Sequence, residues 1–435
     1  MATRKKHPFS GPRGRVAIVD AVRTPFARIA THYRDLSAID LGAHTVRGLM
    51  ARNRLTPAQL DQIVFGMTVM IPEAPFIARE IALVCGLDDV DAYSITRACA
   101  TSFQTVTSAA ESILAGNADI VIAGGTDSTS SVRLPMSPKF SSTLRDVNFA
   151  KTLKDRAKLL ATLRPRDLLP MEPSITEFSV GETMGQSCEK MVKKWGVTRD
   201  EQDDIAHASH SNAAHAWRDG RLDAQVLPLA VNGNEVRSDN LIRMASARDS
   251  YRTLQPCFDR SGQGTVTAGN ASPLTDGASA VLLMSEDTAK ALGYTPLGYL
   301  RASAFAAKTP KDDLLMGPVH ATPVALDRAG LTLADLTLVD MHEAFAGQLA
   351  CNLRGLASAD YASRVLGRPR PVGEVDRTRL NVNGGSIAYG HPFGATGTRI
   401  IGQTLYELRR RGGGLALTTA CAAGGVGAAM VLESE

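Results

Sequence analysis

The sequence predicts an α/β protein made of two similar halves, with a separate segment inserted into the first. Three observations support this fold class. Strands alternate with helices along residues 15–125 and again after residue 264, a pattern typical of a largely parallel sheet with helices on both faces. A polar, proline-punctuated stretch at about 131–255 interrupts the alternation. The second half of the chain then repeats patterns of the first.

The composition is that of an ordinary globular protein. With 435 residues, of which 44% are hydrophobic and 21% charged, the chain can bury two or three domain-sized cores. The net charge of +4 is modest, so we expect no nucleic-acid partner, whereas a small anionic ligand fits. Six scattered cysteines without a Cys-x-x-Cys pair indicate a reducing compartment, and we expect a cytoplasmic protein. No apolar run approaches the ~18 residues that a membrane span needs.

The first half opens with a basic arm at residues 1–14, rich in glycine and proline, which we expect to be flexible. Apolar spacing then predicts the following elements in order: a strand at 15–19, a helix at 36–50, a helical turn at 56–57, a strand at 63–66, a helix at 76–85 and a buried strand at 119–125.

Between the last two of these elements lies the stretch 93–104, in which a short alternating strand turns into a helix of small residues that ends at Gly116. Cys99 lies at the hinge. The dipole and the unpaired backbone N–H groups of a helix start favour a thiolate, which would make Cys99 a nucleophile. Free cysteines are also among the most buried residue types, so an inert core thiol is an equal alternative on this stretch alone.

The inserted segment contains one distinctive pattern, at residues 142–163. One stripe of this segment is apolar while arginines and lysines crowd elsewhere, which predicts a basic amphipathic helix. The apolar stripe contains Leu144, Val147, Leu153, Ala157 and Leu160. Three interpretations stay open: a solvated cover helix, docking on a membrane surface or a partner, and contact with a ligand phosphate.

The second half repeats two units of the first. Residues 332–340 parallel 56–65, each being a capped helical turn that leads into a strand, and residues 426–432 parallel 276–283. We therefore divide the chain into an N-terminal half at 15–295, carrying the insertion, and a C-terminal half at 296–435. Two similar halves packed together would create a shared cleft.

The second half also supplies the residues best suited to chemistry. The glycine-rich stretch 381–398 matches neither a Walker loop nor a dinucleotide fingerprint. Within it, His391 is framed by a glycine and a proline and is a candidate general base. Cys421 ends a strand before a glycine turn, and His342 follows another strand. With Cys99, these residues place two thiols and two imidazoles on turns at strand ends.

These stretches carry a family resemblance. Residues 264–272, 381–397 and 421–427 resemble motifs characteristic of thiolases, and the likeness extends from about residue 15 to the C-terminus. The resemblance implies a thiolase fold, in which two related halves form five layers, α-β-α-β-α, with an inserted loop subdomain and at least a dimer.

The resemblance also implies roles for individual residues. Cys99 would be the nucleophile that accepts the acyl group, and His391 would activate the Cys99 thiol. Cys421 would act as the second acid and base. The backbone N–H groups of Cys99 and of the turn near Ala423 would form an oxyanion hole. Coenzyme A would be a substrate, and no permanently bound cofactor is expected.

Three further details follow from the family pattern. Ser272 resembles a serine that contacts pantetheine, the alternative being a turn hydroxyl. Met184 resembles a residue that lines the coenzyme A tunnel, the alternative being a core filler. The helical context of His207, His210 and His215 resembles an ordinary loop-domain helix, so we expect a solvated face and no metal.

Two departures narrow the resemblance. His342 stands where many thiolases have asparagine, and residues 421–425 read Cys-Ala-Ala-Gly-Gly where many have Cys-x-Gly-Gly-Gly. Both variants resemble the β subunit of fatty-acid-oxidation trifunctional complexes, including the bacterial type. They imply a 3-ketoacyl-CoA thiolase of β-oxidation, paired with an enoyl-CoA hydratase/3-hydroxyacyl-CoA dehydrogenase α subunit in a heterotetramer.

If His342 holds an oxyanion-hole water, the protonation state of His342 matters. A biosynthetic acetyl-CoA acetyltransferase and a non-catalytic scaffold are the alternatives.

Overall fold

The structure is a computed structural model that describes residues 9–171 and 176–435. The described chain forms two compact units. The first comprises the residues up to Ser131 together with Glu177–Glu435, and the second lies within Val132–Thr176. Of the basic arm predicted to be flexible, residues 1–8 lie outside the described residues, whereas Ser10–Gly11 forms strand β1 and pairs with the next strand.

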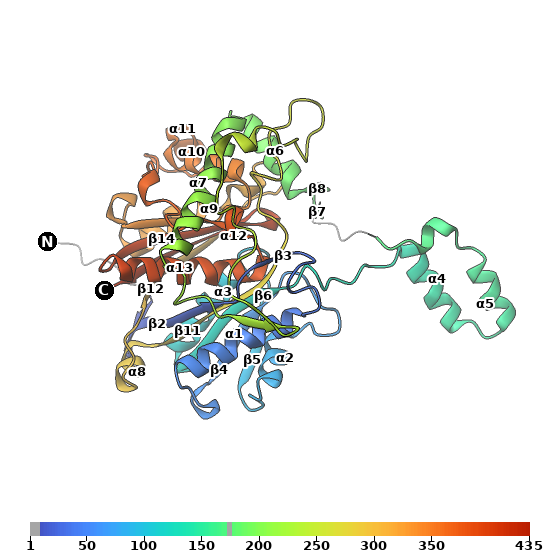
Figure 1. The fold of residues 1–435 in the computed structure, drawn as a ribbon, viewed down its shortest axis with the longest axis horizontal. Coiled ribbons are helices and arrows are strands. Elements are labelled where there is room, and N and C mark those ends of the chain that lie inside the picture. Colours follow the sequence, from blue (N-terminus) through green and yellow to red (C-terminus); the bar gives the residue numbers. More distant parts are fainter. Residues whose placement is uncertain (1–8, 172–175) are drawn as a thin grey trace. The chain divides into compact units, whose positions relative to one another are not determined.

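Helices and strands alternate along much of the first unit (Figure 1). The helices are α1 (Ala38–Arg52), α2 (Ile77–Val84), α3 (Thr101–Ala115), α4 (Pro138–Phe149), α5 (Leu153–Leu160), α6 (Met184–Lys194), α7 (Arg199–Arg218), α8 (Glu286–Ala291), α9 (Gly317–Ala329), α10 (Ala346–Ala357), α11 (Ala359–Arg364), α12 (Ser386–Tyr389) and α13 (Thr396–Arg410). The strands after β1 are β2 (Gly14–Arg23), β3 (Ala27–Arg28), β4 (Gln62–Gly66), β5 (Asp91–Ser94), β6 (Ile120–Asp127), β7 (Thr176–Glu177), β8 (Glu182–Thr183), β9 (Leu229–Val231), β10 (Asn234–Val236), β11 (Thr275–Ser285), β12 (Gly298–Ala307), β13 (Leu338–Met341), β14 (Gly414–Ala422) and β15 (Val426–Ser434). The strands and helices predicted between residues 15 and 125 are thereby confirmed.

The large sheet has the strand order β13-β14-β15-β12-β2-β11-β6-β4-β5. Only the pairings β13-β14, β6-β4 and β4-β5 are parallel, and the five pairings between β14 and β6 are antiparallel. The expectation of a largely parallel sheet was therefore wrong. The reason is local for β14 and β15: only the short turn Ala423–Gly425 joins them, and a turn of that length can make only a hairpin.

Alternating side chains divide the first unit into five layers. On β11, Leu282 packs with α1 and α2 on one face, while Val281 packs with α3 and α13 on the other. On β14, Ala420 faces the same α3 and α13 cluster, whereas Leu417 packs with α9 and α10. The helices α3 and α13 therefore form a central layer between two sheet layers, which confirms the predicted α-β-α-β-α order (Figure 1).

The predicted repeat is visible in the backbone. The short 3-10 helices Pro57–Gln59 and Leu333–Asp335 each begin with a threonine capping box. They lead into β4 and β13, which pair in parallel with β6 and β14. The same unit, a capped helical turn that leads into a strand with a parallel neighbour, therefore occurs once in each half.

The segment 142–163 is not one helix, so this prediction was wrong. Helix α4 ends at Ala150, whose backbone is extended, and α5 begins after Thr152. The Thr152 hydroxyl accepts the N–H of Asp155 at 3.1 Å, which is the N-cap interaction that starts a new helix. Both helices lie in the second unit, whereas α6 and α7, later in the predicted insertion, pack in the first unit against α10 and α12.

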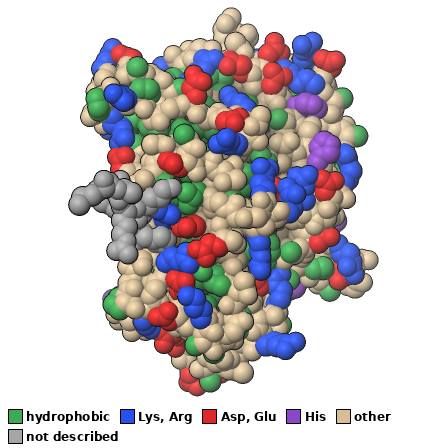
Figure 2. Space-filling view, turned by 90° about the vertical axis from the view of Figure 1, so that its left-hand side faces the viewer, with side chains coloured by type: hydrophobic (Ala, Val, Ile, Leu, Met, Phe, Trp, Pro, Cys, Tyr) green, Lys and Arg blue, Asp and Glu red, His purple; other side chains and the backbone are tan. Residues whose placement is uncertain are grey.

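The surface carries charges of both signs. On the face drawn in Figure 2, lysine and arginine side chains are interspersed with aspartate and glutamate. None of the helices that the structure describes has the length and apolar character needed to cross a bilayer.

Candidate active site

Cys99 lies in a tight turn between β5 and α3. The preceding residue, Ala98, has a left-handed backbone with φ of 46°, which an alanine adopts only at a cost and which marks a shaped turn. The N–H groups of Ala100 and Thr101 are already bonded, to the carbonyl oxygens of Arg97 and Ala98. The start of α3 therefore has fewer free N–H groups near the thiol than its sequence suggests.

Burial raises the pKa of the Cys99 thiol to about 12, and the backbone N–H groups of Ala423 and of Cys99 itself oppose this shift. The expectation that the helix start favours a thiolate is therefore reversed in the resting protein. The thiol keeps its proton and needs a base. The two opposing N–H groups are the pair predicted to form an oxyanion hole, and both act on the position of the sulfur.

Cys421 is the second-last residue of β14 and is buried. Burial raises its pKa well above the usual value, and the nearby Cys99 adds to the shift. The following turn places Gly424 and Gly425 at positive φ. A Cβ on Gly425 would lie 2.2 Å from the carbonyl oxygen of Lys308, so the turn needs glycine there. Because Cys99 contributes to the pKa shift of Cys421, the two thiols are neighbours, and both are protonated at neutral pH.

His342 and His391 lie together, with ring centroids 4.1 Å apart and ring planes inclined by 46°. Both side chains are buried, and neither Nε2 atom has a hydrogen-bond partner among the described residues. Burial lowers the pKa of His391 to about 3, and burial lowers that of His342 well below its usual value. Two neutral imidazoles with unpaired Nε2 atoms are groups prepared to exchange a proton or bind an oxygen.

The tautomer of His391 follows from its neighbour. His391 Nδ1 lies 2.6 Å from the hydroxyl oxygen of Thr396, and that hydroxyl donates to the carbonyl oxygen of Pro392 at 3.0 Å. Because its single hydrogen is used there, the hydroxyl accepts from Nδ1–H. The unpartnered Nε2 of His391 therefore carries a lone pair, which is the form a general base requires.

Asp127, at the end of β6, joins the loops that carry Cys99 and His391. Its buried carboxylate accepts the N–H of Gly394 at 2.6 Å from the His391 loop. It also accepts the N–H groups of Thr68 and Val69, at 2.9 and 2.7 Å. Thr68 in turn donates its hydroxyl hydrogen to the carbonyl oxygen of Ala98, at 3.1 Å. One carboxylate thus fixes both loops, and burial raises its pKa to about 6.

Asn381 and Glu343 fix the turn of His342. The Asn381 amide bonds both the N–H and the carbonyl oxygen of Met341, at 2.7 and 2.9 Å, as a strand neighbour would. It also donates to the Glu343 carboxylate at 2.6 Å. A Cβ on Gly385 would lie 2.3 Å from that carboxylate, which explains a glycine in the middle of the motif.

Ser272 forms a hydrogen bond to the turn that follows His342, and Met184 lies at the start of α6. Ser272 donates its backbone N–H to the carbonyl oxygen of Ala344 at 2.9 Å, and its half-buried hydroxyl has no partner among the described residues. Met184 is the first residue of α6 and packs, partly buried, against the apolar cluster that contains Cys421. Both positions are compatible with contact to a ligand in the site.

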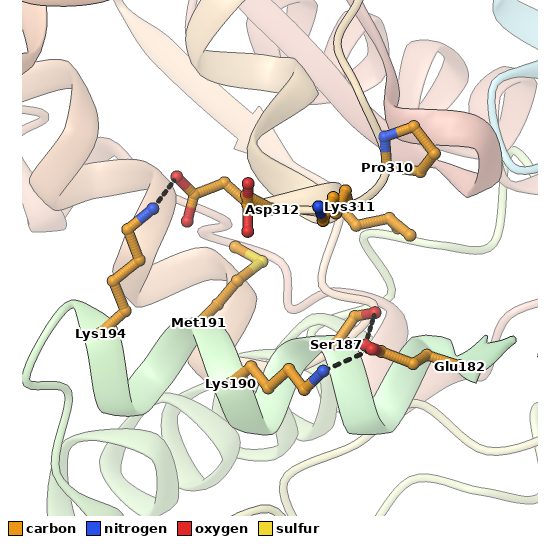
Figure 3. A pocket seen from close by; sticks show the side chains of 10 residues that line it. Glu182, Ser187, Lys190, Met191, Lys194, Pro310, Lys311 and Asp312 are labelled. Atoms are coloured by element: carbon orange, nitrogen blue, oxygen red, sulfur yellow. Dashed lines mark hydrogen bonds and ion pairs between the residues drawn. The ribbon is translucent and has the colours of Figure 1, made fainter. Parts of the chain in front are cut away.

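A small pocket of about 70 Å³ lies between α6 and residues 310–314 (Figure 3). Two of its lysines are paired: Lys194 with Asp313 at 2.6 Å and Lys190 with Glu182. Because these charges are compensated within the pocket, it is a poor phosphate site, and it contains none of the predicted site residues.

The three histidines of α7 do not converge. His207 Nδ1 lies 3.3 Å from the Ser246 hydroxyl, His210 Nδ1 accepts the N–H of Arg243 at 3.1 Å, and His215 is exposed. Within residues 9–171 and 176–435, no group of three or more metal-ligating side chains is placed to hold an ion. The prediction of a solvated face is wrong for His210, which is 3% exposed.

Residues 16–287 match the family model described as "Thiolase, N-terminal domain", and residues 294–434 match "Thiolase, C-terminal domain". The chain belongs to the thiolase family. This thiolase is 55% identical to the 3-ketoacyl-CoA thiolase of Serratia proteamaculans and 54% identical to that of Klebsiella pneumoniae, over 97% of both chains in each case.

Solved structures agree with the family. The thiolase fold superposes on human mitochondrial 3-ketoacyl-CoA thiolase in complex with CoA with a TM-score of 0.82 at 30% identity, over 98% of this chain and 99% of that one. It superposes on the Bacillus anthracis acetyl-CoA acetyltransferase with the same TM-score at 27% identity, over 100% of both chains. The fold alone therefore does not separate a 3-ketoacyl-CoA thiolase from an acetyl-CoA acetyltransferase.

Sequence reasoning missed the residues that hold the site of this thiolase in shape. Ser386 and Thr396 lie within the stretch 381–398, and Arg399 directly follows it. Asp127 is the last residue of β6 and lies just beyond the strand predicted at 119–125. A hydroxyl five residues from a candidate base was a usable signal for Thr396. Nothing in the sequence indicates that Asp127 faces both loops.

Proposed function

We propose that this protein is a 3-ketoacyl-CoA thiolase, an acetyl-CoA C-acyltransferase of fatty-acid β-oxidation. It cleaves a 3-ketoacyl-CoA with coenzyme A into acetyl-CoA and an acyl-CoA two carbons shorter. Relatives that align with 97% of the chain carry the name 3-ketoacyl-CoA thiolase. The proposal rests on the pair of unpartnered Nε2 atoms on His342 and His391, together with two protonated thiols, Cys99 and Cys421, of which the first raises the pKa of the second.

The first step is attack by Cys99. Its high pKa means that the proton leaves only as the sulfur bonds to the 3-keto carbon, and the Nε2 lone pair of His391 accepts it. The keto oxygen gains negative charge and is stabilised by the protonated His391 and by His342, directly or through a water. Cys99 and His391 are both neutral at the start. Charges form only when the substrate is attacked, as a positive imidazolium on His391 and a negative oxygen on the substrate.

The second step breaks the bond between C2 and C3. Its electrons pass to C2 as the enolate of acetyl-CoA, and Cys421 protonates that carbon, because its raised pKa keeps the thiol hydrogen in place until then. Acetyl-CoA leaves, and Cys99 retains the shortened acyl chain as a thioester.

The third step transfers the acyl group. The Cys421 thiolate accepts the proton of a second coenzyme A thiol, whose sulfur attacks the thioester carbon. The N–H groups of Cys99 and Ala423 stabilise the oxyanion, and Cys99 leaves and recovers its proton from His391. Every proton returns to its starting residue, so no further reactant is needed.

The acyl-enzyme can be tested directly. Brief mixing with a 3-ketoacyl-CoA should leave an acyl group on Cys99, detected by mass spectrometry of the peptide. Active enzyme without that adduct would refute the assignment of the nucleophile.

The role of Cys421 is separable from that of Cys99. The variant Cys421→Ala should still accept an acyl group from a simple thioester but lose cleavage of 3-ketoacyl-CoA by more than about 100-fold, as expected for lost general acid catalysis. Equal losses in both reactions would argue against a dedicated acid.

The alternative is a biosynthetic acetyl-CoA acetyltransferase, which the likeness to the Bacillus anthracis enzyme keeps in view. Rates on acetoacetyl-CoA and on 3-ketoacyl-CoA of increasing chain length distinguish the two. A preference for acetoacetyl-CoA would favour the alternative. Loss of thiolysis on alkylation of Cys99 would exclude a non-catalytic scaffold.

For coenzyme A, we propose contacts with Ser272 and Met184. The support is the unpaired Ser272 hydroxyl and the packing of Met184 with the cluster of Cys421. Ser272→Ala and Met184→Ala should raise KM for coenzyme A several-fold with little change in the acylation of Cys99. No change in KM would return them to the turn and core alternatives.

For partners, we propose a homodimer within a heterotetramer that includes a hydratase/dehydrogenase α subunit. Strand β5 ends the described sheet and pairs only with β4 there, so its outer edge is available to a second chain. Light scattering of the purified protein, alone and with the α subunit, tests both assemblies. All six cysteines are free, which supports the proposed cytoplasmic location.

We further propose that the second unit contacts membranes through residues 142–163. Phe149 and Leu153 are 81% and 82% exposed, among basic residues that suit anionic lipid. Replacing both with serine should abolish sedimentation with phosphatidylglycerol vesicles, without changing thiolysis of short substrates. Leu292→Ser, an exposed leucine outside this unit, is the control. Equal binding by all variants would contradict the proposal.

A further inference from the structure

The proton of His342 can be located from its neighbours. His342 Nδ1 lies 2.9 Å from the hydroxyl oxygen of Ser386, on helix α12. The same oxygen accepts a hydrogen bond of 2.7 Å from Nη2 of Arg399, on helix α13. A guanidinium carries donors and no acceptor, so the Ser386 hydrogen cannot point at Arg399.

The two tautomers of His342 differ in how many groups they leave unpaired. If Nδ1 of His342 carried the proton, Ser386 would accept two hydrogen bonds and its own hydrogen would be buried without an acceptor among the described residues. Leaving such a group unpaired costs about 1–3 kcal/mol. If Ser386 donates to Nδ1 instead, its hydrogen is paired and, of these two residues, only the Nε2–H of His342 lacks a partner within the described chain, whereas the other tautomer leaves both the Ser386 hydrogen and the Nε2 lone pair without one. His342 therefore carries its proton on Nε2.

The two imidazoles of the site are therefore complementary. His342 presents Nε2–H as a donor, whereas His391, whose Nδ1–H is held by Thr396, presents the lone pair of Nε2. With the rings 4.1 Å apart, one side of the site supplies a hydrogen and the other accepts one. Because the environment also keeps both rings neutral, the tautomer decides what each does.

We propose that Ser386 and Arg399 are positioning residues that hold His342 as its Nε2–H tautomer, so that a neutral histidine donates a hydrogen bond to the reacting oxygen or to its water. This inference rests on the proposed thiolase reaction. It explains why Arg399, 2% exposed, is buried next to a histidine that must not become charged: its positive charge disfavours the imidazolium while its N–H orients Ser386.

A double-mutant cycle tests the proposal, because an asparagine amide at position 342 donates without any choice of tautomer. Ser386→Ala should lower kcat of thiolysis by about 10-fold or more, with little change in KM. Ser386→Thr, which keeps the hydroxyl, should recover most of the loss. In the His342→Asn background, Ser386→Ala should change kcat by less than about twofold. Equal losses in both backgrounds, or no loss in the first, would overturn the proposal.

A second measurement does not depend on turnover. In protein labelled with ¹⁵N-histidine, the His342 resonances are identified by their disappearance in His342→Asn. Two-bond correlations should show Nε2 protonated and Nδ1 bare in the wild-type protein, and a shift toward Nδ1–H in Ser386→Ala. A wild-type His342 protonated on Nδ1 refutes the proposal even if thiolysis is observed. Absence of thiolysis with the expected tautomer would instead refute the proposed function.

Discussion

The usefulness of His391 as a base depends on a single hydroxyl. An imidazole that is neutral at all working pH values still has two forms, and only the form with a bare Nε2 can take the Cys99 proton. Thr396 selects that form because its hydrogen is committed to the carbonyl oxygen of Pro392. Neighbouring hydrogen bonds, rather than charge, therefore set the reactivity of the residue.

Replacing this hydroxyl should impair chemistry more than stability. Thr396→Val keeps the shape of the side chain but removes the acceptor for Nδ1–H, so we expect acylation of Cys99 to slow by about 10- to 100-fold. Thr396→Ser keeps the hydroxyl and should retain more than about half of the rate. Stopped-flow measurement of acylation by a 3-ketoacyl-CoA checks both variants. A valine variant as fast as the serine variant would contradict this account.

At the scale of single residues, the sequence was a better guide to which side chains are candidates than to their protonation states. Cys99, His391, Cys421 and His342 could be selected because these reactive side chains stand on turns at strand ends, and the structure brings the two histidines together and the two cysteines together. The thiolate at Cys99 could not be judged. Its pKa depends on how much of the surrounding chain excludes water, and that is a property of the packed fold.

Strand β6 contributes to the site through its last residue, although that residue touches no reacting atom in the proposed mechanism. Asp127 accepts N–H groups from the loop after β4 and from the loop of His391, and these loops come from different halves of the chain. The strand end thus acts as a clamp, which sets the separation between the nucleophile turn and the base.

Changing this clamp should affect stability and activity together. In Asp127→Asn, one oxygen can still accept the Thr68 and Val69 N–H groups, but the amide NH₂ would face the N–H of Gly394. We expect a loss of about 2–3 kcal/mol in the free energy of unfolding, with acylation slowed at least about tenfold. Urea unfolding and the acylation rate check the two effects.

Asp61 supplies the matched control for this clamp. Its carboxylate accepts the N–H groups of Asp119 and Ile120 at 2.8 and 2.9 Å, at the start of the same strand. Asp61→Asn should cost stability without slowing acylation. If the two variants slow acylation equally, β6 acts on the site only through general stability.

The secondary structure was predictable where local signals agreed. The stretch after β5 gave both the hinge and the helix because small residues run to Gly116, which caps α3 at positive φ. The stretch 142–163 misled because leucine spacing continues across Thr152, where capping starts a new helix. Apart from the β14–β15 hairpin, strand directions in the large sheet could not be read, since they depend on which distant strands become neighbours.

At the scale of the whole molecule, the five layers bury the site and its ionisable groups together. The central α3 and α13 layer brings the residues that follow Cys99 against those that follow His391: the Thr398 N–H donates to the Ser102 hydroxyl at 3.0 Å. This burial has a cost, because several titratable groups must stay neutral, and these groups make stability depend on pH.

The buried groups act in opposite directions. Burial lowers the pKa of His210 and His391 to about 3, below the ordinary 6.5, so the unfolded chain binds extra protons between these values and stability rises with pH there. Burial raises the pKa of Asp340 to about 7 and of Asp127 to about 6, above the ordinary 3.8. For these carboxyls the folded chain binds the extra proton, so stability falls as pH rises from about 4 to 6.

The histidines and the carboxyls change stability in opposite directions over the same pH range. Removing one histidine should therefore make the contribution of the carboxyls easier to see. His210 is buried on α7, and its Nδ1 accepts the Arg243 N–H, an interaction that an asparagine oxygen can replace. In His210→Asn, the dependence of the unfolding free energy on pH should become more negative by about 1.4 kcal/mol per pH unit between pH 4.5 and 6. Urea unfolding at four pH values and fixed protein concentration measures the slope. His215→Asn, on the exposed part of the same helix, should keep the wild-type slope. Parallel slopes in all three proteins would mean that His210 is protonated in the folded state.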